Sequence, residues 1–380
     1  MRAKTLKVWH SKITELPLVC IKFTSNKIII GASMSALSRR KMCKYFFLRI
    51  SPFLASIVSS FLLNYQSKKI LGFSSQPLTS EANILTERGN FLEEISRIKK
   101  LALPKNSHLY QNPTTADLDN FRVLASSLIS QDINTAANKA NVLNYEIVKF
   151  IDISSGQAFY SLRERRVLGY PIRGWGSYFI NPTYSSNALV EVPHVLFDKF
   201  SEEIGAKAFL GSAARGFLVA GAHRDANGTD TADVCNPINS IFQEVHKAWT
   251  SSQAKTWQIH GFSISDKPSF PSNTQSILSD GKGRLSTEVM DLSQRMRLRS
   301  FITYVYNELS ASDVLNQQVN QGVAGQAFSS LGGTQNVQGV YCHSVGTAFT
   351  HIELEKSVRD SSTNRDLVSR SIADSIQAMT

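Results

Sequence analysis

The sequence predicts an α/β fold with a mixed, largely parallel central sheet flanked by helices. From residue 141 onward, short apolar strands alternate with amphipathic helical patterns, which is typical of a sheet covered by helices on its faces. Several of these strands end in or contain a histidine. Because ligands of open α/β sheets bind at the carboxyl ends of the strands, we expect a functional site there.

The order of the predicted elements supports this fold class. Residues 145–153 and 157–164 flank a Ser-Ser-Gly turn and predict a hairpin. Further strands are predicted over residues 174–182, 188–194, 216–224, 256–264, 301–309 and 349–357, and helices over residues 195–210, 239–252, 286–299 and 363–379. Before them, residues 84–101 and 114–140 have helical patterns. We therefore expect a helical extension over residues 81–140, followed by an α/β domain over residues 141–380.

The charge of the chain is concentrated at its N-terminus. The formal net charge is +11, but residues 1–80 hold 13 of the 41 Lys and Arg residues and only one of the 30 acidic residues. The remaining 300 residues are close to neutral. A nucleic-acid-binding domain carries a basic surface of its own, so the sequence argues against nucleic acid as a partner.

An apolar run over residues 50–63 follows a cluster of basic residues. This pattern predicts a signal peptide, because a spanning helix needs about 20 apolar residues. An uncleaved membrane anchor is the alternative. In either case the protein is exported or anchored, and contact with a membrane is expected only through residues 1–80.

The cysteines do not indicate the redox compartment. Cys20 and Cys43 lie in the N-terminal segment, and no CxxC pair is present. Cys235 and Cys342 can form at most one disulfide in the body of the chain, and two buried free thiols are the favoured interpretation.

The first cluster of candidate site residues lies at a strand-to-helix junction. His194 ends a predicted strand, and Asp198 follows it about one helical turn later. Zn²⁺ is commonly bound by imidazole and carboxylate groups with one position left for water. His260, at the end of another strand, is the natural third ligand. Glu191 is the alternative to Asp198 as the carboxylate ligand.

Two further clusters carry groups suited to catalysis and substrate binding. Arg224 directly follows His223 after a strand and is suited to binding a substrate carboxylate. In the strand 349–357, His351, Glu353 and Glu355 share one face. A glutamate beside a metal-bound water can act as general base and acid, although a solvated edge strand is the alternative interpretation.

Taken in order, these motifs resemble the zinc carboxypeptidase-like amidohydrolases, in particular the branch of N-formylglutamate amidohydrolases and poly-γ-glutamate hydrolases. The resemblance covers about residues 188–360. It rests on the Pro-His motif at His194, the His223-Arg224 pair where the family has Asn-Arg, His260-Gly261, and Ile352-Glu353. The first motif departs from the family because it lacks the HxxE spacing.

The resemblance implies a hydrolase/phosphorylase-like zinc peptidase architecture and cleavage of an amide bond. It implies zinc held by His194 and His260, with Glu353 as the general base. The carboxylate ligand between them, Asp198 or alternatively Glu191, is expected from its place in this sequence. His223, Arg224 and Arg359 would then bind the carboxylate of a small-molecule or peptide substrate. A non-catalytic binding module on a degenerate form of this fold is the alternative. No GxSxG, GxxxxGK[ST] or GxGxxG motif supports serine or nucleotide chemistry.

Overall fold

The computed structural model describes residues 84–166, 172–250, 253–306 and 330–380, together with the backbone of three strands near the N-terminus. The chain divides into two compact units, Met1–Thr79 and Ser80–Thr380. In the first unit, β1 (Thr5–Leu6), β2 (Leu18–Thr24) and β3 (Lys27–Ser33) form an antiparallel sheet. The apolar run over residues 50–63, with the predicted signal peptide or anchor, lies outside the described residues.

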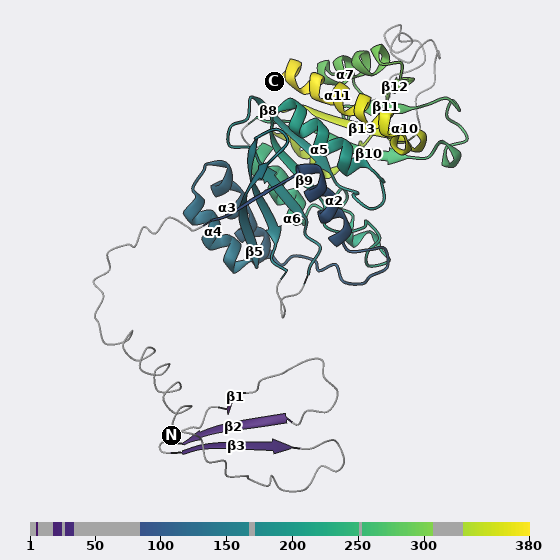
Figure 1. The fold of residues 1–380 in the computed structure, drawn as a ribbon. Helices are drawn as coiled ribbons and strands as arrows, with labels where there is room; N and C mark the ends of the chain where they lie inside the picture. Colours follow the sequence, from purple (N-terminus) through teal and green to yellow (C-terminus); the bar gives the residue numbers. More distant parts are fainter. Residues whose placement is uncertain are drawn as a thin grey trace. The chain divides into compact units, whose positions relative to one another are not determined.

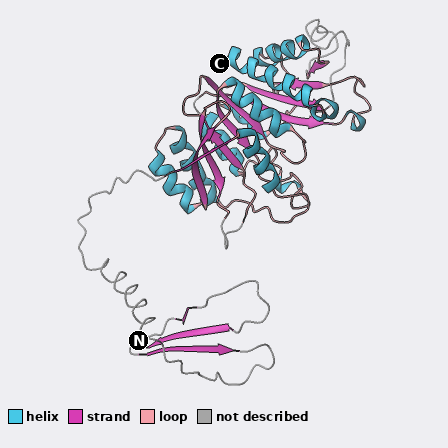
Figure 2. Ribbon diagram, in the orientation of Figure 1, coloured by secondary structure: helices cyan, strands magenta, loops and turns pink. Residues whose placement is uncertain are grey.

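The second unit is built on one ten-stranded mixed sheet flanked by helices (Figures 1 and 2). This confirms the predicted fold class. Across the sheet, the strands are β12 (Thr303–Val305), β11 (Ser276–Ser279), β13 (Phe349–Glu355), β10 (Lys255–Phe262), β8 (Ser186–Val192), β9 (Ala214–Val219), β7 (Ser177–Ile180), β6 (Ala158–Glu164), β5 (Tyr145–Asp152) and β4 (Leu85–Gly89). The four strands β13, β10, β8 and β9 are mutually parallel and form its centre.

Helices cover both faces of the sheet. One apolar core lies between the sheet and α2 (Phe91–Leu101), α5 (Ser201–Ser212), α7 (Thr287–Leu298) and α11 (Ser362–Met379). A second core lies between the opposite face and α3 (Thr115–Ile129), α4 (Ile133–Val142) and α6 (Ile241–Thr250). The short helices are η1 (Asp230–Ala232), η2 (Ile264–Asp266), α9 (Val337–Ser344) and α10 (Lys356–Asp360).

The central strands present two chemically different faces. Alternate side chains such as Val190, Trp257 and Ile352 enter the first core. Their neighbours Gln258 and His351 are register partners and project from the opposite face. That face is apolar in the middle of β8 and becomes polar toward the carboxyl ends of the strands, which is where the candidate site lies.

Two of the predicted helices differ from the structure, whereas the predicted hairpin is confirmed. The helix predicted over residues 84–101 is the edge strand β4 followed by α2, because β4 pairs with β5 and Asn90 caps the helix. The helix predicted over residues 114–140 is interrupted between α3 and α4, where Gln131 has a positive φ and Asp132 caps α4. The predicted 145–164 hairpin is confirmed as β5 and β6, and it continues the central sheet.

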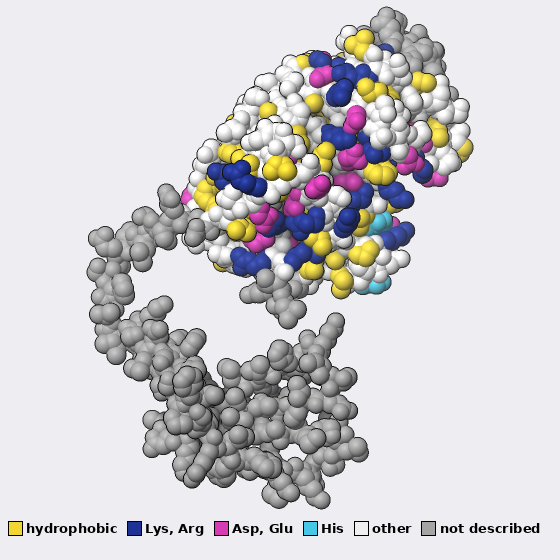
Figure 3. All heavy atoms as spheres, viewed as in Figure 1, with side chains coloured by type: hydrophobic (Ala, Val, Ile, Leu, Met, Phe, Trp, Pro, Cys, Tyr) yellow, Lys and Arg dark blue, Asp and Glu magenta, His cyan; other side chains and the backbone are white. Residues whose placement is uncertain are grey.

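The surface of the second unit agrees with its near-neutral charge. On the face seen in Figure 3, basic, acidic and apolar side chains are interspersed. None of the described helices combines the length and the apolar character needed to span a membrane.

Candidate metal centre

Three neighbouring parallel strands bring the predicted site residues together. His194 follows the end of β8, and His260 and Glu353 are register partners on β10 and β13. Parallel strands end at the same edge of a sheet, so these side chains meet on the face that carries α6. His194, His260 and Glu353 are all buried, with 4 to 6% of their surface exposed.

The segment between β8 and α5 forms turns. The predicted helix 195–210 therefore begins later, at Ser201. Within these turns, the backbone N–H of Asp198 donates to the carbonyl of His194 over 2.8 Å. This bond places the two side chains on the same side of the turn, with Asp198 Oδ2 3.2 Å from His194 Nδ1.

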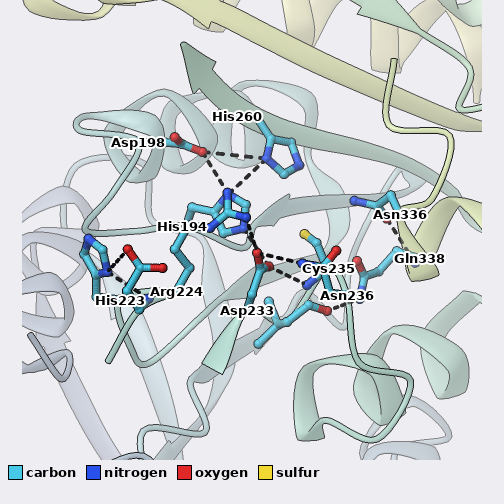
Figure 4. A network of polar contacts seen from close by, with 12 residues as sticks. His194, Asp198, His223, Arg224, Asp233, Cys235, Asn236, His260, Asn336 and Gln338 are labelled. Carbon is cyan, nitrogen blue, oxygen red and sulfur yellow. Dashed lines mark hydrogen bonds and ion pairs between the residues drawn. The ribbon is translucent and has the colours of Figure 1, made fainter. Parts of the chain in front are cut away.

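Three donor atoms converge at this turn (Figure 4). His260 Nδ1 lies 3.2 Å from His194 Nδ1 and 3.6 Å from Asp198 Oδ2. The three atoms thus form a nearly equilateral triangle of two imidazole nitrogens and one carboxylate oxygen. This is a donor set that Zn²⁺ prefers.

Asp233 contacts the opposite nitrogen of the first histidine. Its Oδ1 lies 3.0 Å from His194 Nε2, and its carboxylate also accepts hydrogen bonds from the Cys235 N–H and the Asn236 amide. Arg224 forms an ion pair with it. Burial by itself would raise the pKa of Asp233, but the bond with His194 and the positive charges outweigh burial and lower it. The resulting carboxylate orients His194 so that Nδ1 faces the triangle.

Glu191, the alternative carboxylate ligand, points away from the triangle. Its Oε1 lies 2.7 Å from His246 Nδ1, and its Oε2 accepts from the Gln258 amide over 2.9 Å. Glu191 and His246 are both 0% exposed. Glu191 therefore belongs to a buried pair beneath the site.

Glu353 and His351 form the wall of the site on β13. This strand lies between β10 and β11, and all seven of its residues are buried, so the solvated-edge interpretation is wrong. Burial, followed by the charge of Asp198, raises the pKa of Glu353 to about 8. Among the described residues, its Oε2 has no hydrogen-bond partner. Burial also lowers the pKa of His351 to about 3, which keeps that ring neutral.

The triangle opens into a pocket of about 700 Å³. Arg224 lines it, with its guanidinium 5.4 Å from the centre of the exposed Phe197 ring. His223 packs against the same ring, and its Nδ1 accepts from the Asp225 N–H. Unlike Arg224, His223 does not line the pocket.

Arg359 also lines the pocket, but its guanidinium is directed at the main chain. It donates to the carbonyls of Leu354, Lys199 and Phe262 over 2.9 to 3.1 Å. It thereby joins the turn after β8 to β10 and β13. Gly261 gives it room, since a Cβ at that position would lie 2.5 Å from the guanidinium carbon. Close packing against Arg359 therefore explains why a glycine follows His260.

Both cysteines of the second unit are buried free thiols. Cys235, His194 and His260 place donor atoms within 4.8 Å of one another, as do His260, His351 and Glu353. The Nε2 atoms of His194 and His260 are already engaged with Asp233 and Gln258. The Asp198 triangle, in contrast, uses the two Nδ1 atoms, which face each other.

Several residues of the site carry no recognisable signal in the sequence. Asp233 and Cys235 lie in an irregular segment after η1, and Gln258 is one of several polar residues in β10. The Asn336 and Gln338 amides come from the start of α9, a helix that the sequence pattern did not predict. His351 had a partial signal, because strand alternation places it on the face of Glu353.

Comparisons of the chain with protein-family models, with curated proteins and with solved structures found no match. The functional inference therefore rests on the geometry of the site.

Proposed function

We propose that the second unit is a zinc-dependent hydrolase that cleaves an amide or peptide bond in a substrate carrying a carboxylate. The observation that carries this proposal is the triangle formed by His194 Nδ1, Asp198 Oδ2 and His260 Nδ1, with edges of 3.2, 3.2 and 3.6 Å. The resemblance to zinc carboxypeptidase-like amidohydrolases implies His194 and His260 as two of these ligands.

The triangle has the dimensions of a zinc site. Zn–N and Zn–O bonds of about 2.0–2.1 Å in a tetrahedron place neighbouring donors roughly 3.3 Å apart. The chemistry that a bound zinc supplies is activation of a water molecule and polarisation of a carbonyl.

Glu353 is suited to the proton transfers of amide hydrolysis. Its carboxylate is buried at the pocket wall, and its raised pKa of about 8 lies near neutral pH. A group with such a pKa can accept a proton from water and return it to a leaving amine efficiently. The uncommitted Oε2 is the atom to which we assign this role.

Positive side chains around the pocket favour a substrate with a carboxylate. Lys199, Arg224, Lys267 and Lys356 line it together with Arg359, alongside the carboxyl groups of Asp198, Asp233, Asp266, Glu353 and Asp360. Lys356 is paired with Asp360. Lys267 donates to the neutral hydroxyl of Ser330 over 3.3 Å, so its charge is available to a substrate anion. Arg224 shares its guanidinium with Asp233 but has further N–H groups.

The test is metal content and turnover measured on the same sample. The full chain, purified without chelator and supplied with zinc, should hold close to one zinc per chain and hydrolyse a member of a panel of N-acyl amino acids and short acidic peptides. His194→Ala and His260→Ala should lose the metal, whereas His108→Ala, in a loop, should keep it. Absence of zinc from the wild type would contradict the proposal. Bound zinc without turnover on any panel member would favour the non-catalytic binding module.

A further inference from the structure

A buried glutamine lies directly beneath the candidate metal centre. Gln258, on β10, is 0% exposed and is the register partner of Glu191 on β8 and His351 on β13. Its side-chain amide contacts five other side chains, those of Glu191, Gln338, His260, Asn336 and Cys235. Because an amide oxygen only accepts and an amide nitrogen only donates, the direction of each contact can be worked out from its partners.

The nitrogen end of Gln258 is identified by two acceptors. Nε2 lies 2.9 Å from a carboxylate oxygen of Glu191 and 3.2 Å from Gln338 Oε1. The direction of the Gln338 amide is itself determined, because its Nε2 donates to the backbone carbonyl of Val234 over 2.9 Å. Both partners therefore accept, and Gln258 donates to both.

The oxygen end is identified independently by α9. Asn336 caps this helix, and its Oδ1 accepts from the backbone N–H groups of Gln338 and Gly339. Its Nδ2 must then be the atom that donates to Gln258 Oε1 over 2.6 Å. Backbone groups thus determine the orientation of the whole amide network around Gln258.

This orientation decides which nitrogen of His260 carries the proton. His260 Nε2 lies 2.7 Å from Gln258 Oε1. Since that oxygen only accepts, Nε2 is the donor and holds the proton. In a neutral imidazole the other nitrogen then has a free lone pair. That nitrogen is Nδ1, the atom that faces His194 and Asp198.

The network is anchored by the buried pair of Glu191 and His246. Glu191 Oε1 lies 2.7 Å from His246 Nδ1 on α6, and the two side chains have no solvent exposure. A buried carboxylate requires such a partner, because an unpaired charge is costly in the protein interior. Because this carboxylate accepts from Gln258 Nε2, it prevents the Gln258 amide from exchanging the positions of its oxygen and nitrogen.

We propose that Gln258, oriented by Glu191, Gln338 and Asn336, is a positioning residue that holds His260 in the Nε2–H tautomer and leaves Nδ1 free as a metal donor. The tautomer of His260 follows from these contacts alone. The effect of Gln258 on metal affinity rests in addition on the proposed function.

The tautomer can be read directly from the metal-free protein. The full chain, labelled with ¹⁵N-histidine and freed of metal with chelator, is measured by long-range ¹H–¹⁵N NMR, with His260→Ala used for assignment. The wild type should show His260 protonated on Nε2. In Gln258→Met the acceptor is gone, and the proton should move to Nδ1, where Asp198 lies 3.6 Å away. A wild-type ring protonated on Nδ1, or an unchanged tautomer in Gln258→Met, would overturn the proposal.

Metal affinity provides the second measurement, with Co²⁺ as the probe in competition with a chelator. Gln258→Met should bind about 10- to 100-fold more weakly, the usual effect of losing an outer-shell partner. Gln258→Glu should bind at least as tightly as the wild type. Burial beside Glu191 keeps the new carboxyl group protonated on the oxygen that donates to Glu191, and its other oxygen still accepts from His260. Thr256→Val is the matched control, since Thr256 is buried on the same strand and face and contacts Cys342 instead. Its affinity should stay within twofold.

The two variants at position 258 separate positioning from a purely structural role. If Gln258→Glu and Gln258→Met weaken Co²⁺ binding equally, the hydrogen bond to His260 does not matter for the metal and the proposal fails. If Gln258→Met does not fold, the tautomer of His260 in the wild type and the Co²⁺ affinity of Gln258→Glu still test the proposal. If the tautomer is as expected but neither the wild type nor any variant binds metal, the proposed function fails. The role of Gln258 in fixing the tautomer of His260 then still holds.

Discussion

His194 and His260 face each other through their Nδ1 atoms, 3.2 Å apart, on segments separated by more than 60 residues. The Nε2 atom of each ring contacts a hydrogen-bond acceptor, which is Asp233 for His194 and Gln258 for His260. The two Nδ1 atoms are thereby directed to the same point, next to Asp198 Oδ2. Two histidines oriented in this way are matched to a metal ion.

The first prediction separates Asp198 from Cys235 as the third ligand. Asp198→Ala should lose most of its bound zinc, because it removes one corner of the triangle. Cys235→Ser should keep its zinc, because the sulfur lies beside Gln258 Oε1, where the His260 Nε2–H is already bonded. Metal analysis after dialysis against zinc-free buffer measures both. Loss of zinc in Cys235→Ser alone would make Cys235 the third ligand in place of Asp198.

The second prediction concerns Glu353. Glu353→Gln keeps the size of the side chain but removes the base, so turnover should fall by a factor on the order of 10²–10⁴ while zinc content is unchanged.

The matched control is Glu355→Gln on the same strand. Glu355 caps α10 and bonds to the Ser357 and Ile264 N–H groups, away from the pocket. This variant should keep its activity and lose about 1 kcal/mol of the free energy of unfolding. Full activity in Glu353→Gln would show that Glu353 is structural, and loss of zinc would make it a ligand.

The third prediction compares the pocket cations. Lys267→Ala and Arg224→Ala should raise KM for substrates with a free carboxylate more than for the corresponding amides, because they remove binding to the anion. Arg359→Met should instead lower the free energy of unfolding by roughly 3 kcal/mol, since it removes the guanidinium donors from two buried carbonyls and from the partly buried carbonyl of Lys199. Steady-state kinetics and chemical denaturation distinguish the two effects. A stable Arg359→Met protein with a selectively raised KM would restore Arg359 as a carboxylate-binding residue.

The fourth prediction is a dependence of stability on pH. Burial opposes the charged form of His246, but the charge of Glu191 outweighs it and raises the pKa of His246 to about 10. A pKa raised above the ordinary value of about 6.5 stabilises the folded state fully below pH 6.5, and this contribution is lost as pH rises toward 10.

Denaturation of the metal-free protein at pH 6 and pH 9.5 checks this. The wild type should lose more stability between these values than the double variant Glu191→Gln/His246→Gln, in which the pair is replaced by neutral groups. Other groups that titrate in this range are common to both proteins and cancel in the difference. Equal losses would show that the buried pair is not charged at neutral pH.

The alternation of strand and helix patterns was enough to predict the α/β class and the strands that carry the site. It also placed His194, His260 and Glu353 near one another, because parallel strands end at one edge of a sheet. The sequence also predicted that Asp198 lies close to His194, because the two residues are four positions apart. These features are local or periodic, so they can be recognised in the sequence itself.

The tertiary structure decided what surrounds each of these groups. Strand order put β13 between β10 and β11, which buries Glu353 and raises its pKa. Because α6 packs on that side of β8, Glu191 pairs with His246, and Asp198 is the carboxylate that lies beside the two histidines. Asp233 and the amides of α9 reach the site from irregular segments and a short helix with no periodic pattern. Contacts between residues far apart in the chain depend on how the helices and loops pack on the sheet, and for that reason they became visible only in the folded molecule.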